Sequence, residues 1–438
     1  MDALPPCPDP ALQAQLSQTR RRFHRQPERS WTEYQTSARL CAELAALGYE
    51  LCWGPALYAR GEASNPPPAE QEQAAYARAE AALGADHPYL AGQRPHRTGV
   101  VASLDGGGPG PVFGFRFDID ALPIQESDAA DHPPSAAGFA STSPGLMHAC
   151  GHDGHLTIGL GLARRLAASR ARWRGRVHLL FQPAEEVAGG GVLFAELAQL
   201  REVQYLVALH LGIVDRYRLI CDARWIASRI FEVEFEGRAS HAGNAPQQGR
   251  NALLAACHAV LGLYGIARHS DGVTRVNVGP FNAANAHNVI PDRVRLRYEV
   301  RGADGALCDY MAAEAQRRLA GAAAMQGVSW RQTPYAAFAS AANSPELAAR
   351  VAEVARELGL PDALLQPAYQ VPASEDAGYL VHQVRAQGGA ATHLILGCPV
   401  AGGHHSSRFD FDEAWLGWGV LLLERLLTRG GARRPGPP

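Results

Sequence analysis

The chain has 438 residues, of which 47% are hydrophobic and 19% are charged, a balance typical of globular proteins of two or three domains. Its 41 Lys and Arg residues nearly balance its 43 Asp and Glu residues, which does not favour nucleic acid or a membrane surface as the main partner. The sequence contains no apolar run of about 18 residues, so it predicts no membrane-spanning helix.

The N-terminus and the cysteines indicate the compartment. The first residues, "MDALPPCPDP", lack a basic start and an apolar segment, so we expect no signal peptide. The 8 cysteines are scattered and form no CxxC pair, which argues against a zinc ribbon and against a disulfide framework. A reducing cytoplasm is the expected location.

The first half of the chain alternates helices with buried strands. Residues 11–48 predict two helices separated by "RQPERS", and residues 71–85 predict a further helix that resembles an insertion. Residues 99–120 predict paired strands around a glycine-rich turn, which lacks the pattern of a nucleotide fingerprint. A helix at 156–168 precedes apolar strands at 176–182 and 205–210. This order predicts an α/β sandwich.

A second texture begins near residue 224. There the chain turns to strands of alternating polarity and two helices, which predict a small α+β domain with an open antiparallel sheet. The first texture resumes after about residue 336. We therefore expect a catalytic domain formed by 1–223 and 337–438, with 224–336 inserted into it.

Candidate metal ligands follow four predicted strands. Because open α/β sheets assemble their sites at the carboxyl ends of strands, these side chains are expected to converge. They are Asp118, Asp120, Glu185, Glu186, His210, His404 and His405.

The loop "MHACGHDGH", residues 147–155, adds three histidines, a cysteine and an aspartate. Any one of these could be an ordinary buried side chain or a solvated helix start. Two adjacent acids after a buried strand, however, require a neutralising partner, and the joint pattern favours a metal site. Imidazole, carboxylate and thiolate donors suit Zn, Mn or Co. Of two adjacent glutamates, one could bind metal while the other transfers protons.

Eight motifs in order resemble the M20 metallopeptidase family, in its aminoacylase/carboxypeptidase branch. They are "FDIDALP", "MHACGHDGH", "FQPAEE", "ALHLG", "GRASHAGNAP", "HNVIPD", "SEDAGYL" and "GHHSSRFDFDE". The resemblance implies a zinc-peptidase-like α/β/α catalytic domain and an inserted ferredoxin-like lid that also mediates dimerisation, as a homodimer or with a homologous subunit.

The resemblance also implies two divalent metal ions per chain, with Mn²⁺ favoured and Zn²⁺ or Co²⁺ as alternatives. Cys150 resembles a bridging thiolate, at the position where other branches use Asp. His405 fits the family spacing to Phe409 better than His404, although proline is usual where Ser407 stands, so both histidines stay candidates. The implied ligands are Cys150, His152, Glu186, His210 and His405.

Other residues acquire roles through the same resemblance. Glu185 resembles the general base, and His241 resembles an imidazole that reaches the substrate carbonyl oxygen. Asn288 and Arg301 are candidate binders of the substrate carboxylate. The resemblance also implies that two aspartates orient ligands and that two histidines of the loop either pack or bind metal. These are Asp118 and Asp120, and His148 and His155.

The implied activity is hydrolysis of the amide bond of an N-acyl or aroyl amino acid. The leading substrate is p-aminobenzoyl-glutamate, which would give p-aminobenzoate and glutamate. Indole-3-acetyl-aspartate is an alternative substrate, and a chain that is active only with a homologous partner is another alternative. A different mechanism would use Cys150 as a nucleophile paired with His152.

Overall fold

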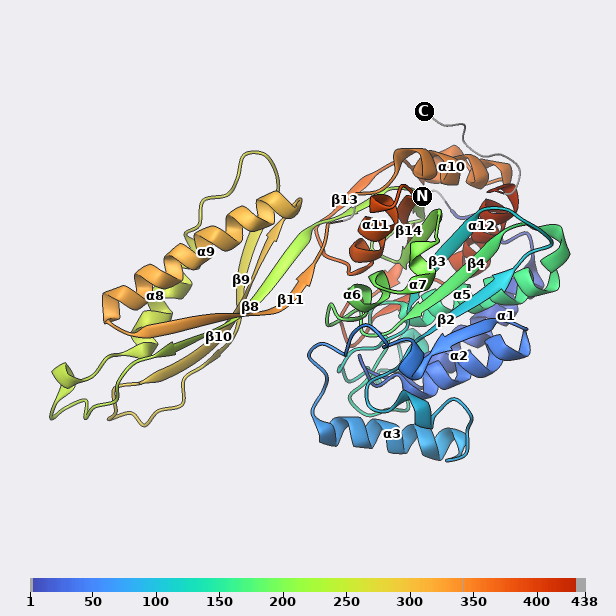
Figure 1. The fold of residues 1–438 in the computed structure, drawn as a ribbon. Helices are drawn as coiled ribbons and strands as arrows, with labels where there is room; N and C mark the ends of the chain where they lie inside the picture. The colour runs from blue at the N-terminus through green and yellow to red at the C-terminus, as the bar shows by residue number, and fades with distance from the viewer. Residues whose placement is uncertain (1–2, 341, 431–438) are drawn as a thin grey trace. The chain divides into compact units, whose positions relative to one another are not determined.

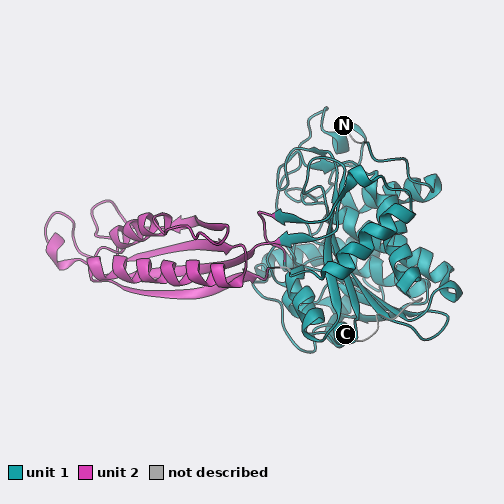
Figure 2. Cartoon of the chain, turned by 90° about the horizontal axis from the view of Figure 1, so that it is seen from above, with its two compact units in different colours: residues 1–224, 341–370, 376–438 teal, residues 225–340, 371–375 magenta. Residues whose placement is uncertain are grey.

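The computed structural model describes residues 3–340 and 342–430, which form two compact units (Figure 2). Unit 1 contains the described residues of 1–224, 341–370 and 376–438. Unit 2 contains residues 225–340 and 371–375. Strand β11, Ser329–Phe338, extends unit 2 beyond residue 336.

Within the described residues, unit 1 is built on a mixed eight-stranded sheet in the order β1-β2-β4-β3-β5-β14-β6-β12. Four adjacent strands, β4, β3, β5 and β14, are parallel, so their carboxyl ends lie at one edge. The bounds are β1 Glu50–Trp53, β2 Val100–Asp105, β3 Val112–Asp118, β4 Arg176–Gln182, β5 Tyr205–Leu211, β6 Arg218–Ile220, β12 Leu365–Gln366 and β14 Ala390–Gly397.

Helices cover both faces of this sheet (Figure 1). One layer contains α1 Pro10–His24, α2 Tyr34–Ala46, α5 His152–Ala168, α10 Pro345–Glu357 and α12 Trp415–Gly430. The other contains α6 Gly190–Ala195, α7 Ala198–Arg201 and α11 Ala377–Ala386. A further helix, α3 Ala69–Leu83, packs on α2. The predicted α/β/α fold class is confirmed.

The expected pairing of two strands around the glycine-rich turn at 99–120 is wrong. Strands β2 and β3 do not pair, because β4 lies between them, antiparallel to β2 and parallel to β3. The glycine-rich link between them packs against the residues before β4. A Cβ at Gly106 would lie 2.6 Å from the Trp173 ring, so the close approach requires glycine.

Unit 2 has the ferredoxin-like order of two βαβ halves. Its four-stranded antiparallel sheet runs β11-β8-β10-β9, with two helices packed on one face. The strands are β8 Ala227–Glu236, β9 Thr274–Asn282, β10 Arg293–Gly302 and β11, and the helices are α8 Ala252–Tyr264 and α9 Gly305–Gln326. Valines, leucines and alanines of the helices and of alternate strand positions form its own core.

None of the helices in the described part of the chain combines the length and the apolar character needed to cross a bilayer.

Candidate metal centre

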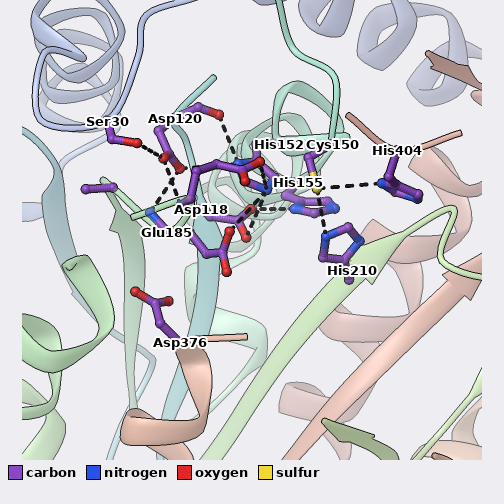
Figure 3. A network of polar contacts seen from close by, with 12 residues as sticks. Ser30, Asp118, Asp120, Cys150, His152, His155, Glu185, His210, Asp376 and His404 are labelled. Atoms are coloured by element: carbon purple, nitrogen blue, oxygen red, sulfur yellow. Dashed lines mark hydrogen bonds and ion pairs between the residues drawn. The ribbon is translucent and has the colours of Figure 1, made fainter. Parts of the chain in front are cut away.

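The carboxyl ends of the four parallel strands and the start of helix α5 meet in one buried cluster of polar side chains (Figure 3). Asp118 is the last residue of β3, and His210 is the second-last residue of β5. Glu185 follows β4 by three residues, and His152 opens α5. Strand direction therefore brings together groups that are far apart in the sequence.

The thiol of Cys150 belongs to two groups of potential ligands. His152 and His210 form one group with it, and Glu186 and His405 form the other; the ligand atoms within each group lie within 4.8 Å of one another. The Cys150 Sγ is 3.5 Å from the His210 Nε2. A sulfur that belongs to two groups of donors is the arrangement that a bridging thiolate between two ions requires.

Both histidines of the 404–405 pair approach the thiol. His404 places its Nδ1 3.6 Å from the Cys150 Sγ. His405 adopts a positive φ of 62° and places its Nε2 3.4 Å from a carboxylate oxygen of Glu186. The two rings therefore contact different members of the cluster, and His405 is the one that completes a three-ligand group with Glu186.

Backbone carbonyls fix two of the imidazoles. The His152 Nδ1–H donates to the carbonyl oxygen of Asp120 at 2.9 Å, and the His210 Nδ1–H donates to the carbonyl oxygen of Leu211 at 2.8 Å. In each neutral ring the lone pair is then on Nε2, which is the nitrogen that faces the cluster. The orientation needed for metal binding is thus built into the protein.

Asp120 also holds the two glutamates. Its carboxylate accepts the backbone N–H groups of Glu185 and Glu186, each at 3.1 Å, and a hydrogen bond from the Ser30 hydroxyl at 2.6 Å. Asp118 accepts hydrogen bonds from His155 and from Arg116, the latter at 2.7 Å. Asp120 thus holds the backbone of the two glutamates and Asp118 holds one ring of the loop, while the orienting role that the resemblance implies for both aspartates stays a prediction.

The remaining polar residues of the 147–155 loop do not belong to the two groups that contain Cys150. His155 donates from Nδ1 to Asp118 and accepts at Nε2 from the Leu211 N–H at 2.9 Å, so both ring nitrogens are occupied. Asp153 accepts from Arg20 at 2.8 Å and contacts His24. Within the described residues, neither nitrogen of buried His148 has a hydrogen-bond partner.

The surroundings of the cluster raise the pKa values of two of its acidic groups. Burial and the nearby charge of Asp120 together raise the pKa of Glu186 to about 8, although the charge of His152 acts in the opposite direction. Burial and Glu186 raise the pKa of the Cys150 thiol well above its usual range. Without cations, the thiol would thus stay protonated, which disfavours Cys150 as a free nucleophile.

The donor set fits divalent ions. In the part of the chain that the structure describes, the buried His152 Nε2 and one Glu186 oxygen have no hydrogen-bond partner. Such orphaned buried groups are costly unless something binds them. Imidazole, carboxylate and thiolate donors are those used for Zn²⁺ and its neighbours, and a bound cation would favour the thiolate and the carboxylate. The residues present therefore fit a two-metal site.

A buried ion network next to this cluster predicts a pH dependence of stability. His24 lies between Asp153, at 2.9 Å, and Glu126, at 3.0 Å. Burial opposes its charged form, but hydrogen bonds to both carboxylates outweigh burial and raise the pKa of His24 to about 9. The unfolded-state pKa is about 6.5. The contribution of protonated His24 to the free energy of unfolding is therefore fully present below pH 6.5 and is lost as pH rises through 9.

We expect the unfolding free energy of EDTA-treated protein to fall by up to about 3 kcal/mol over that interval through His24 alone. His24→Gln should remove this part of the pH dependence. The measurement is urea unfolding of both proteins at pH 6, 7.5 and 9. Equal pH slopes for the two proteins would contradict the assignment.

His241 lies in unit 2, exposed, in the segment after β8. Its Nδ1 accepts the backbone N–H groups of Gly243 and Asn244 at 3.1 and 3.0 Å. The neutral ring must then carry its proton on Nε2, which makes that nitrogen a hydrogen-bond donor. Asn288 is next to it, since its carbonyl oxygen accepts the Ala242 N–H at 2.9 Å.

Arg301 is not brought together with Asn288. It lies near the end of β10 and pairs with Glu299 at 3.0 Å, whereas Asn288 precedes the start of that strand. At about 3.4 Å per residue, the eight steps along the strand from Arg293 to Arg301 span roughly 27 Å. Within one chain these two residues cannot bind the same carboxylate.

Sequence reasoning did not identify Ser30, Arg20, His24 or Arg116 as supports of the site. The segment "RQPERS" predicts only a break between helices. Glu28 and Ser30 within it are buried, and burial is not visible in the sequence.

Three comparisons agree with this architecture. The family profile described as Peptidase family M20/M25/M40 matches residues 114–429. A p-aminobenzoyl-glutamate hydrolase subunit of Escherichia coli (strain K12) is 37% identical over 95% of each chain. The indole-3-acetyl-aspartic acid hydrolase of Enterobacter agglomerans is 38% identical over 92% of each chain.

Solved structures show the same similarity. An aminobenzoyl-glutamate utilization protein from Klebsiella pneumoniae is 32% identical, with a TM-score of 0.77 and 96% of each chain covered. A dinuclear metal binding peptidase of the M20 family from Bacillus subtilis is 25% identical, with a TM-score of 0.70, over 96% of this chain and 99% of that one.

The fold and the paired ligand groups define a hydrolase of the dinuclear metallopeptidase type. This chain belongs to peptidase family M20/M25/M40.

Proposed function

We propose that this protein is an amidohydrolase that uses two divalent ions to cleave an N-acyl or aroyl amino acid, with p-aminobenzoyl-glutamate as the leading substrate. The observation that carries the proposal is the position of Glu185. It immediately precedes Glu186 in the cluster, and its Oε2 lies 3.9 Å from the His152 Nε2. A carboxylate beside the proposed ligands, but outside the two groups that contain the Cys150 thiol (the thiol-centred groups), is the expected general base.

The proposed ligands are the five residues of the two thiol-centred groups, which would hold Mn²⁺, or alternatively Zn²⁺ or Co²⁺. Bound there, the ions would polarise the substrate carbonyl and lower the pKa of a water molecule. The ligands are Cys150, His152, Glu186, His210 and His405.

In the proposed reaction, Glu185 takes a proton from the attacking water while the water oxygen bonds to the carbonyl carbon. The carbon–nitrogen bond then breaks, and Glu185 delivers the proton to the departing amine. The Nε2–H of His241 would donate a hydrogen bond to the carbonyl oxygen as negative charge develops on it. Asn288, beside His241, is the proposed contact for the substrate carboxylate; Arg301 could serve only a separate position.

Two relatives give the substrate alternatives. The Escherichia coli p-aminobenzoyl-glutamate hydrolase and the indole-3-acetyl-aspartic acid hydrolase match this chain at nearly equal identity, 37% and 38%. Both names describe an aromatic acyl group joined to an acidic amino acid. Indole-3-acetyl-aspartate is therefore the second candidate substrate. The eight cysteines are all free, which supports the proposal of a cytoplasmic enzyme.

The test is elemental analysis of the purified chain, with hydrolysis of both conjugates before EDTA, after EDTA and after re-addition of Mn²⁺, Zn²⁺ or Co²⁺. We expect about two ions per chain, loss of turnover with their removal, and recovery with one of the metals. Full activity of metal-free protein would refute the proposal. A fully loaded chain that is inactive on both substrates would favour the requirement for a second, homologous chain.

We further propose that the protein dimerises through unit 2, with itself or with a homologous subunit. The four exposed residues of helix α8 are separated by three, four and three positions, so they form one apolar stripe along the helix. Leu261 is 73% exposed and Tyr264 is 49% exposed. Exposed apolar stripes of this kind indicate a protein interface. The stripe consists of Leu254, Cys257, Leu261 and Tyr264.

Leu261→Arg is expected to convert the dimer to monomer, because it places a charge in the centre of the stripe. Light scattering after size-exclusion chromatography would measure the mass. Ala77→Arg, which adds the same charge to the exposed surface of helix α3, is the control and should leave the mass unchanged. A Leu261→Arg protein that remains dimeric would place the interface elsewhere.

A further inference from the structure

The turn that carries Glu185 and Glu186 has a strained backbone. Two alanines, Ala184 and Ala188, flank the glutamates, and both adopt a positive φ of 54°. For a residue with a Cβ, the left-handed region costs about 1–2 kcal/mol. Such a conformation persists only where surrounding contacts hold it, so the position of the glutamates depends on those contacts.

Three consecutive backbone N–H groups of this turn point at buried carboxylates. Asp120 accepts two of them, from Glu185 and Glu186 at 3.1 Å each. The third, from Ala184, is accepted at 2.9 Å by Glu33, a residue 151 positions earlier in the chain. Successive N–H groups around a left-handed residue form a concave site for acceptor oxygens, and here carboxyl oxygens of the protein itself occupy it.

Glu33 is directed to this turn rather than to its own helix. It precedes the first residue of α2 as the N-cap, where a side chain usually accepts an N–H of its own first turn. No such bond is made within the described residues. Instead Glu28 accepts the Gln35 and Thr36 N–H groups at 2.9 and 2.7 Å. The helix is capped by one glutamate, which leaves the other available for the turn.

The carboxylate of Glu33 is completely buried and has a second fixed partner. The Thr98 hydroxyl donates to its Oε2 at 2.6 Å while its Oε1 holds the Ala184 N–H. Trp31, two residues earlier, is also buried, has a positive φ of 66°, and packs its ring where a Cβ on Gly189 would be 2.4 Å away. The segment therefore supports the turn at both of its ends.

We infer that Glu33 is a positioning residue for Glu185, because it fixes the left-handed conformation of Ala184. The inference rests on the proposed function, in which Glu185 moves the proton and Glu186 binds metal. Loss of the Glu33 carboxylate would leave the Ala184 N–H buried without an acceptor and would allow the turn to relax. A displacement of about 1 Å in a catalytic group can reduce turnover about 100-fold.

The experiment compares three variants by kcat, KM, metal titration of the metal-free chain and amide hydrogen exchange of the peptide covering residues 183–190. Glu33→Ala should lower kcat at least about tenfold with little change in KM, weaken metal binding, and speed exchange in that peptide. Glu33→Gln keeps an oxygen acceptor and should retain most of the turnover. Glu28→Ala is the matched control: it removes a buried glutamate that caps α2, and should lower stability without changing kcat.

Where Glu33→Ala does not fold, Glu33→Asp replaces it, since a side chain one methylene shorter cannot keep both contacts. Normal kcat, metal affinity and exchange in a folded Glu33→Ala or Glu33→Asp protein would overturn the inference, as would equal effects of Glu28→Ala. Exchange and metal titration need no substrate. If the unaltered chain hydrolyses neither conjugate, the proposed function fails, while these two measurements still decide the role of Glu33.

Discussion

Replacing Glu185 by glutamine is expected to lower turnover of p-aminobenzoyl-glutamate by about 10²–10⁴-fold, the usual contribution of a general acid–base group. Glutamine has the same shape but cannot accept and return a proton at neutral pH. The backbone of residue 185 is held by Asp120 through its N–H, and that bond does not depend on the side chain. The bound metal should therefore remain near the level of the unaltered protein.

The neighbouring glutamate provides the control. Glu186→Gln should release metal, because Glu186 is a member of the group formed with Cys150 and His405. Elemental analysis and steady-state kinetics of the two variants separate a proton-transfer role from a ligand role. If Glu185→Gln lost metal and Glu186→Gln kept it, the two roles would be the reverse of those proposed.

The sequence was sufficient to predict where the site assembles. Apolar runs of strand length marked β4 and β5 with errors of at most one residue, and polar side chains followed each run. Because parallel strands align their carboxyl ends, this pattern predicts convergence without knowledge of the strand order. Candidate ligands can thus be recognised from the sequence when they follow strands that are buried on both faces.

Strand order and register were not predictable in the same way. The glycine-rich link between β2 and β3 favoured a hairpin, yet β4 separates those strands, a long-range pairing that local sequence does not encode. Arg301 illustrates a second limit. Its strand was predicted, but the length of that strand separates it from Asn288, and a residue's position along a sheet depends on pairing with neighbours.

The supports of the site were hidden for a further reason. Arg20, His24 and Glu33 belong to no ligand-like pattern, and on a surface each would be an ordinary polar residue. Their importance follows from complete burial, which forces each to find partners in the 147–155 loop or in the turn after β4.

Cys150→Ala is expected to abolish activity and to reduce bound metal below one ion per chain. In the proposed site its sulfur belongs to both groups of ligands, so its removal would take a donor from both ions at once, whereas loss of His210 or Glu186 would weaken one. Cys150→Asp should bind more metal than Cys150→Ala, since a carboxylate can also bridge two ions. Cys41→Ala, which removes a buried thiol from helix α2, is the control and should keep both ions.

Metal per chain, circular dichroism and turnover of the three variants distinguish the possible causes of inactivity. A folded Cys150→Ala protein with full metal content but no turnover would mean that the sulfur acts in the chemistry and not as a ligand. That result is not expected, because burial and Glu186 hold the pKa of the Cys150 thiol well above its usual range, and an uncoordinated thiol in that environment is a poor nucleophile. Bound cations would favour its ionised form, which is why metal binding and the function of this residue should be lost together.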